Sequence, residues 1–238
     1  MSRRRKNGNT IHENGNGKPI NRLPSTNSKQ LHKELKPKTN NQAEYIRAMV
    51  DSDITICTGP AGTGKTACAV GLACGKLVRG EVEHIVITRP VMETGRTGLG
   101  YLPGSMIEKI HPYLVPILEE MQIYLGKTRT ELFLTTGKIK IVPLEYMRGY
   151  NFHNSFIILD EAQNATLSQI KMFITRIGTD STVVMAGDIQ QSDLYDDNIG
   201  LKVCVDKLND IRGVSIVTLT TEDIIRNSII SKILAKLE

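Results

Sequence analysis

The stretch Gly59-Pro60-Ala61-Gly62-Thr63-Gly64-Lys65-Thr66 has the pattern G-x-x-x-x-G-K-T, which is the phosphate-binding P-loop. A β-branched run over residues 54–58 precedes it and predicts a buried strand. An apolar run over residues 67–77 follows and predicts a helix that opens at the loop. The loop glycines let backbone N–H groups turn toward phosphate oxygens, and the helix N-terminus adds unpaired donors. Strand, loop and helix are the context that this motif requires.

Two side chains of the loop carry the expected chemistry, and all of residues 59–66 are candidates for binding a nucleotide. Lys65 can reach the β- and γ-phosphates, and the Thr66 hydroxyl can bind Mg²⁺. The alternative is a glycine-rich turn before an ordinary helix. The agreement between motif and context disfavours that alternative.

A second landmark is the apolar run Phe156-Ile157-Ile158-Leu159, which is followed by Asp160 and Glu161. The run predicts a strand buried on both faces, and the two carboxylates at its end form the Walker B pattern. We expect Asp160 to hold Mg²⁺ through water and Glu161 to orient and deprotonate the attacking water. Asp160 could instead only cap the next helix, but the upstream P-loop makes the catalytic interpretation the better one.

Apolar strands and amphipathic helices alternate along the rest of the chain. We expect further strands over residues 83–88, 138–144, 182–186 and 214–219, and helices over residues 39–50, 169–177 and 198–209 and from residue 220 onward. In residues 105–125, Pro112 and Pro116 predict that a helical stretch breaks into two pieces. The alternation predicts one three-layer α/β/α domain with a mainly parallel sheet.

Several loops at strand ends are candidates for function. Residues 91–104 form a long, glycine-rich stretch after strand 83–88, where an open α/β sheet has its nucleotide crevice. In the loop 146–150, Tyr146, Arg148 and Tyr150 could stack bases, and a packed surface loop explains them equally well. Residues 187–194 follow another strand, and an amide or carboxylate there can sense the γ-phosphate.

Composition bounds the remaining possibilities. Hydrophobic residues make up 40% and charged residues 23% of the 238 residues, which indicates a mostly globular chain. No apolar run approaches the ~20 residues of a membrane span, and the basic start of the chain has no apolar run behind it. We therefore expect a cytoplasmic protein with neither a membrane partner nor a secretory signal. The four cysteines show no C-x-x-C pair, which favours buried free thiols.

The net charge of +5 is concentrated at the N-terminus. Residues 1–38 hold ten basic and two acidic residues, a net charge of +8, so the remaining 200 residues carry −3. This segment is rich in Asn, Gly, Lys and Pro and predicts a disordered tail, with the folded domain over residues 39–238. A basic arm suits a nucleic acid, and a solubilising tail without a partner is equally consistent.

Taken together, these motifs resemble the PhoH family of P-loop ATPases, whose core is similar to one RecA-like half of a superfamily 1 helicase. The resemblance covers about residues 37–230. It is carried by the two landmarks and by residues 39–42, 88–90, 98–104, 146–149, 187–194 and 222–226. It implies ATP hydrolysis with Mg²⁺, a homo-oligomeric ring such as a hexamer, and a role on single-stranded RNA.

The resemblance also implies roles for single residues. A Gln in the first turn of a helix can present its amide to adenine or merely face solvent, and the family favours adenine recognition by Gln42. It likewise indicates Gln191 as the γ-phosphate sensor. Arg226 is the candidate arginine finger, which would act on the ATP of a neighbouring subunit, with Arg176 in reserve.

Two other functions are also consistent with the sequence. Hydrolysis could switch a protein partner rather than act on RNA. The chain could also be an ATP-linked ribonuclease, in which Asp160, Asp188 and Asp193 hold two metals. A single core has no second RecA-like domain, so we do not expect helicase activity from a monomer.

Overall fold

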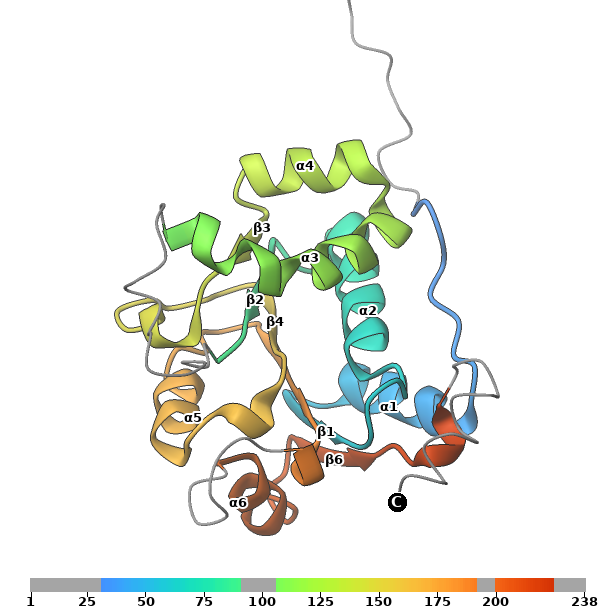
Figure 1. Cartoon of the computed structure of the whole chain (residues 1–238), viewed down its shortest axis with the longest axis vertical. Helices are drawn as coiled ribbons and strands as arrows, with labels where there is room; N and C mark the ends of the chain where they lie inside the picture. Colours follow the sequence, from blue (N-terminus) through green and yellow to red (C-terminus); the bar gives the residue numbers. More distant parts are fainter. Residues whose placement is uncertain (1–30, 91–105, 192–199, 225–238) are drawn as a thin grey trace, which may run out of the picture. The chain divides into compact units, whose positions relative to one another are not determined.

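The structure, a computed structural model, describes residues 31–90, 106–191 and 200–224. It contains a six-stranded sheet in the order β3-β2-β4-β5-β1-β6, in which each described pair of neighbours is parallel (Figure 1). The strands are β1 (Ile54–Thr58), β2 (His84–Thr88), β3 (Ile139–Ile141), β4 (Ser155–Leu159), β5 (Thr182–Gly187) and β6 (Val214–Thr218). The predicted α/β class is confirmed. Because parallel neighbours need crossover connections, helices link these strands.

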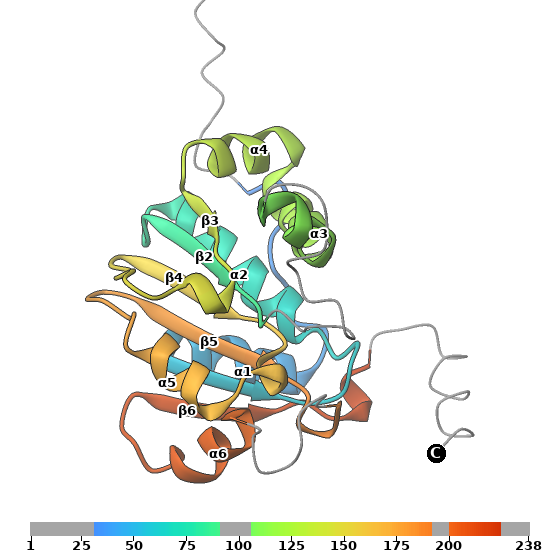
Figure 2. The ribbon, with the colours of Figure 1, turned by 60° about the vertical axis from the view of Figure 1, so that its left-hand side comes forward.

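Helices cover both faces of the sheet (Figure 2). They are α1 (Asn40–Asp51), α2 (Lys65–Arg79), α3 (Met106–Leu125), α4 (Lys127–Thr135), α5 (Leu167–Ile174) and α6 (Gly200–Lys207). Short 3-10 helices lie at the strand ends: η2 (Leu144–Tyr146), η3 (Ala162–Asn164), η4 (Ile189–Gln191) and η6 (Thr221–Asp223). Among the described helices, none is long and apolar enough to cross a membrane.

Two buried apolar clusters fill the space between the sheet and its helices. One cluster contains residues of α1, α2 and α3, and the other contains residues of α5 and α6. Successive side chains of a strand point to opposite faces. Strand β4 accordingly contributes Phe156 and Ile158 to the first cluster, and Ile157 and Leu159 to the second. This arrangement confirms that the apolar run before Asp160 is a strand buried on both faces.

The prediction of two helical pieces over residues 105–125 is wrong, because α3 runs without a break from Met106 to Leu125. Each proline removes only one backbone donor, and that local loss is outweighed by packing. In the second half of the helix, Ile117 and Met121 are buried in the first apolar cluster against α2. Helix α4 was not predicted, because its sequence has no apolar stripe and only Thr130 is buried in it.

Other boundaries follow the prediction closely. Thr39 is the N-cap of α1 and accepts a hydrogen bond from the Gln42 backbone N–H at 3.1 Å. Strand β3 is shorter than predicted, since Pro143 follows it and η2 begins at Leu144. All four cysteines are buried and free, as predicted. The glycine-rich loop over residues 91–104 and the predicted last helix beyond residue 224 lie outside the described residues.

Residues 31–38, which the sequence assigned to the basic tail, form an extended segment against the domain. Leu31 and Leu35 pack on the first apolar cluster. The His32 backbone N–H donates to the Tyr124 carbonyl on α3 at 2.7 Å, and the Lys38 backbone N–H donates to Gln42 Oε1 at 2.9 Å. We call this segment the N-terminal strap. It ties α3 to the start of α1.

A buried carboxylate joins the start of α1 to the segment after β6. Asp223 is 1% exposed and accepts hydrogen bonds from Thr39 Oγ1 (2.5 Å), Asn41 Nδ2 (2.9 Å) and the Thr220 backbone N–H (2.7 Å). Burial by itself would raise the pKa of Asp223, but these hydrogen bonds favour the ionised form and lower it below its usual value. Asp223 therefore ties the chain around Gln42 to the end of the sheet.

We predict that Asp223→Asn lowers the free energy of unfolding by about 1–3 kcal/mol at pH 7, because an amide cannot accept all three hydrogen bonds. A lowered folded-state pKa stabilises the fold above the unfolded value of about 3.9, and this contribution is lost as the pH falls below it. The difference between wild type and variant in urea titrations should therefore shrink below about pH 4. Asp210→Asn, at an exposed carboxylate, is the control and should change stability by less than about 0.5 kcal/mol. Equal stability of Asp223→Asn and wild type at pH 7 would contradict this account.

Candidate functional site

The P-loop lies between β1 and α2, and its shape depends on glycines with left-handed backbone angles. Gly59, Gly62 and Gly64 have φ values of 145°, 84° and 89°. A Cβ on Gly59 would collide with the Leu219 carbonyl, and one on Gly64 would lie 2.7 Å from Gln42 Nε2. Both positions therefore require glycine for close approach as well as for conformation. Helix α2 begins at Lys65, so its N-terminal N–H groups face the loop.

Lys65 lies across the mouth of the loop. Its Nζ donates to the carbonyls of Gly59 at 2.5 Å and of Pro60 at 2.9 Å. Burial lowers the pKa of Lys65, and the carboxylates of Asp188, Glu161 and Asp160 oppose this effect. The ammonium group is thus held at the centre of the loop by two neutral acceptors. An anionic ligand in the loop would be a stronger partner for it.

Thr66 and Asp160 meet at the site, although they lie far apart in the sequence. The Thr66 hydroxyl donates to Asp160 Oδ1 at 2.7 Å. Asp160 follows β4 and is 6% exposed, and this burial raises its pKa, while the Thr66 hydrogen bond lowers it. A hydroxyl and a carboxylate in contact are oxygen ligands of the kind that Mg²⁺ prefers. The chemistry of this pair therefore fits the metal role predicted for both residues.

Glu161, the predicted general base, has an uncommon backbone conformation and two partners for its side chain. Its φ of 52° is left-handed, which is uncommon for a residue other than glycine. Arg89, at the end of β2, forms an ion pair with it at 3.2 Å (Nη2 to Oε1). The amide of Gln163 donates to its other oxygen, Oε2, at 2.6 Å. Both carboxylate oxygens thus have partners, so the carboxylate has a defined direction.

Gln163 is a residue that the sequence did not single out. It is 3% exposed, and its Oε1 accepts a hydrogen bond from the Asp188 backbone N–H at 3.1 Å. One buried amide therefore joins Glu161, after β4, to the backbone after β5. The signal for it in the sequence was weak, since a Gln two residues after a carboxylate pair is an ordinary polar residue until the fold is known.

One cavity of about 440 Å³ lies at the carboxyl edge of the sheet. The P-loop, Asp160 and Glu161 contribute to it, together with Arg89, Asp188 and Gln191. Gln191, the predicted γ-phosphate sensor, is exposed in η4, and its backbone N–H donates to the Asp188 carbonyl at 3.1 Å. The structure therefore brings Lys65, Thr66, Asp160, Glu161 and Gln191 together. Arg226, the predicted arginine finger, lies outside the described residues.

Gln42, the predicted adenine reader, lies against the P-loop rather than in solvent. It is 2% exposed, its Nε2 donates to the Thr63 carbonyl at 2.8 Å, and its Oε1 accepts from the Lys38 backbone N–H. Each end of the amide thus has one protein partner already. Through these bonds Gln42 connects the N-terminal strap to the P-loop.

Comparison with known proteins places this chain in a family. A family model described as "PhoH-like protein" matches residues 34–238. The chain is 42% identical over 203 residues to the PhoH-like protein of Bacillus subtilis (strain 168), covering 85% of this chain and 63% of that protein. It is 37% identical over 196 residues to Protein PhoH of Escherichia coli (strain K12), covering 81% and 55%. The chain thus spans less than two thirds of these relatives.

A solved structure supports the fold. The large terminase from a thermophilic bacteriophage superposes with a TM-score of 0.56 at 11% sequence identity, covering 84% of this chain and 50% of that one. At this identity the likeness concerns the fold alone. The match over residues 34–238, together with relatives at about 40% identity, shows that the chain belongs to the PhoH-like protein family.

Proposed function

We propose that this protein binds ATP with Mg²⁺ and hydrolyses it to ADP and phosphate. The observation that carries the proposal is the convergence of Lys65, Thr66, Asp160 and Glu161 on one cavity beside the N-terminus of α2. A loop that only bound phosphate would need neither of the two carboxylates. Thr66 and Asp160 would hold Mg²⁺, which would neutralise charge on the phosphates when bound.

The roles follow from the position of each group. Backbone N–H groups of the P-loop and Lys65 bind the phosphates, and Thr66 and Asp160 are the residues that would hold Mg²⁺. Glu161 is the general base, because its carboxylate lines the same cavity and two neighbours set its direction. Gln191, the last residue of η4, is the proposed sensor of the γ-phosphate.

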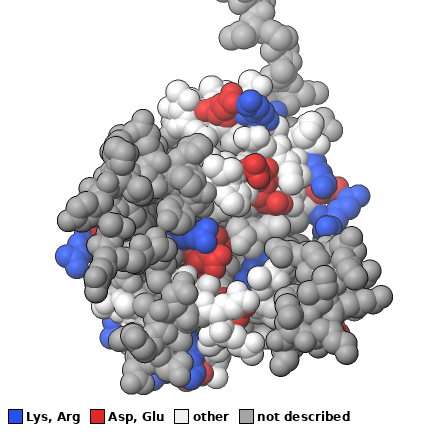
Figure 3. Space-filling model, in the orientation of Figure 1, with Lys and Arg blue, Asp and Glu red and all other residues white. Residues whose placement is uncertain are grey.

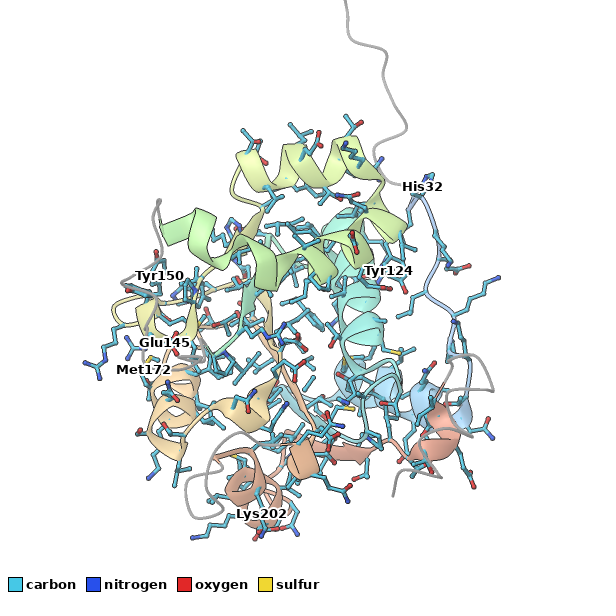
Figure 4. The ribbon with its side chains drawn as sticks, viewed as in Figure 1. His32, Tyr124, Glu145, Tyr150, Met172 and Lys202 are labelled. Atoms are coloured by element: carbon cyan, nitrogen blue, oxygen red, sulfur yellow. The ribbon has the colours of Figure 1, made fainter. Side chains whose placement is uncertain are left out.

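We propose further that hydrolysis is coupled to single-stranded RNA. The support is the loop after β3, which lies at the same edge of the sheet as the site. Tyr146 and Tyr150 on this loop are 53% and 46% exposed, and Figure 4 shows Tyr150 with Glu145 on it. The Leu144 backbone N–H donates to the Arg89 carbonyl at 3.3 Å, and the Arg89 side chain pairs with Glu161. A base stacked on this loop would therefore be connected to Glu161 through two contacts, the hydrogen bond between Leu144 and Arg89 and the ion pair between Arg89 and Glu161.

On the face in Figure 3, basic and acidic side chains of the described residues alternate and form no large patch of one sign. Stacking would then supply the main contact with RNA, and the basic segment at the N-terminus would supply charge. The homo-oligomeric ring and the action of Arg226 on a neighbouring subunit belong to this proposal as well.

The ribonuclease alternative gains no support from the site. Among the described residues, no group of three or more His, Cys, Asp or Glu side chains is placed to hold a metal ion. Asp193, the third carboxylate of that hypothesis, lies outside the described residues. A switch that acts on a protein partner would use the same ATPase site. It differs from RNA coupling in that RNA would not change the rate of ATP hydrolysis.

Substitutions in the cavity test the ATPase directly. Lys65→Ala should abolish turnover, because the ammonium group meets the phosphates and no other cation of the P-loop can replace it. Glu161→Gln should still bind ATP and Mg²⁺ but hydrolyse ATP roughly 10²- to 10⁴-fold more slowly, the usual loss for a general base. Lys202→Ala, at an exposed lysine on α6 (Figure 4), is the control and should keep the wild-type rate. Phosphate release is the measurement. A wild-type rate in Lys65→Ala, or a loss of less than tenfold in Glu161→Gln, would contradict the assignment.

Gln163→Ala should lower kcat at least tenfold while KM for ATP changes by less than about threefold. The variant removes the donor that orients Glu161 and leaves the Asp188 N–H without its acceptor, and neither group belongs to the P-loop. Steady-state kinetics with a melting curve for each variant check this, and Gln122→Ala on α3 is the matched control. If kcat holds and only the melting temperature falls, Gln163 has a structural role alone.

RNA coupling predicts that single-stranded RNA raises the ATPase rate and that Tyr146→Ala removes most of the increase while leaving the basal rate unchanged. Stacking on an aromatic ring is worth about 1–3 kcal/mol per base, so RNA affinity should fall roughly 5- to 160-fold. Ile211→Ala is the control, since this side chain is similarly exposed (47%) but precedes β6, at the amino edge of the sheet. No stimulation of the wild type by RNA would favour a protein partner instead.

A further inference from the structure

A second cavity lies beside the P-loop, on the side of the N-terminal strap. It has a volume of about 390 Å³ and shares Gly62, Gly64, Ala67 and Glu120 with the cavity that holds the catalytic groups. The two spaces therefore meet across the P-loop. A ligand whose phosphates occupy the first cavity has its remaining part directed either into the second cavity or into solvent.

Hydrogen bonds fix the strap that forms one wall of the second cavity. The strap is fixed at both ends, by the His32 bond to the Tyr124 carbonyl and by the Lys38 bond to Gln42. Figure 4 shows His32 and Tyr124 close together on neighbouring segments. Between these anchors Leu35 packs toward α2, where a Cβ on Gly71 would lie 2.9 Å from its Cδ1. The strap is thus held at a defined distance from α2 and α3.

The lining suits a flat ring system. Leu35 on the strap, Ile123 on α3 and Ala67 on α2 supply apolar surface from three sides. Ile123 is 39% exposed, so it offers a face that no described part of the chain covers. The volume lies within the range of about 300–1,000 Å³ that is typical of small-molecule pockets.

Glu120 is the polar side chain that both cavities share, and its charge indicates what it contacts. A carboxylate repels phosphate, so it serves no purpose toward the anionic end of the ligand. It accepts hydrogen bonds from hydroxyl donors, and the ribose is the part of a nucleotide that carries two of them, between the phosphates and the base. An acidic residue on ribose hydroxyls is an established solution in other nucleotide sites. Tyr124 lines the same cavity, and burial, together with the carboxylate of Glu120, raises the pKa of Tyr124.

We propose that the cavity between the N-terminal strap and α3 binds the nucleoside of the nucleotide, and that Glu120 accepts hydrogen bonds from the ribose hydroxyls. The inference rests on the proposed nucleotide binding and adds that the site selects ribonucleotides over deoxyribonucleotides. Gln42 fixes the strap to the P-loop, because its amide bonds to both.

The test is the binding of ADP, 2′-deoxyADP and 3′-deoxyADP to the full chain, measured by calorimetry with Mg²⁺. Wild type should bind ADP roughly tenfold more tightly than either deoxy form, since a hydrogen bond to a charged group is lost. Glu120→Ala should bind all three alike and about as weakly as wild type binds the deoxy forms. Glu120→Gln, which keeps the shape of the side chain, should retain part of the preference and guards against a folding defect in Glu120→Ala. Glu119→Ala, at the adjacent exposed carboxylate of the same helix, is the matched control and should behave as wild type.

The outcomes separate this inference from the ATPase proposal. Equal affinity of wild type for ADP and both deoxy forms, or an unchanged preference in both Glu120 variants, would overturn the role of Glu120. Selective binding of ADP without any hydrolysis of ATP would support the nucleoside cavity and overturn only the ATPase proposal. Failure to bind any of the three nucleotides would overturn both.

Discussion

The hydrogen bond from the Thr66 hydroxyl to Asp160 joins the two halves of the site, and it exists because of the strand order. Strands β1 and β4 are not neighbours, since β5 lies between them. In an all-parallel sheet the carboxyl ends of all strands lie at one edge. The loop after β1 and the carboxylate after β4 can therefore meet across the end of β5. Any change in the register of β4 against β5 would move Asp160 away from Thr66.

The same edge concentrates negative charge where the proposed ligand is also negative. Asp160, Glu161 and Asp188 lie around Lys65, and each of them opposes the effect of burial on the lysine pKa. Arg89 and Gln163 bind the carboxylate of Glu161. Lys65 bonds to two carbonyls, Thr66 to a carboxylate and Glu161 to an arginine. All three side chains thus bond to groups of the protein itself, although their chemistry also suits a bound ligand or metal. Cations and phosphates would replace these pairings with stronger ones.

The sequence predicted the parts of this site that depend on local pattern. The P-loop and the Asp160–Glu161 pair have fixed spacing and clear flanking runs, so their strands were located within a residue or two. Gln163 and the Arg89–Glu161 pair were not predicted, because they arise only when β2, β4 and β5 are aligned. The sequence did not predict that the N-terminal strap packs on the domain, for a related reason. Its composition resembles the tail, and only the packing of Leu31 and Leu35 distinguishes it.

We expect phosphate and metal to replace the internal hydrogen bonds that Lys65 and Thr66 make with the protein. A crystal structure of Glu161→Gln with Mg²⁺ and ATP measures this most directly. The account predicts that Lys65 Nζ leaves the Gly59 and Pro60 carbonyls for a phosphate oxygen, and that Mg²⁺ lies between Thr66 Oγ1 and Asp160. It would be contradicted if the triphosphate were bound elsewhere while both pairings stayed as they are.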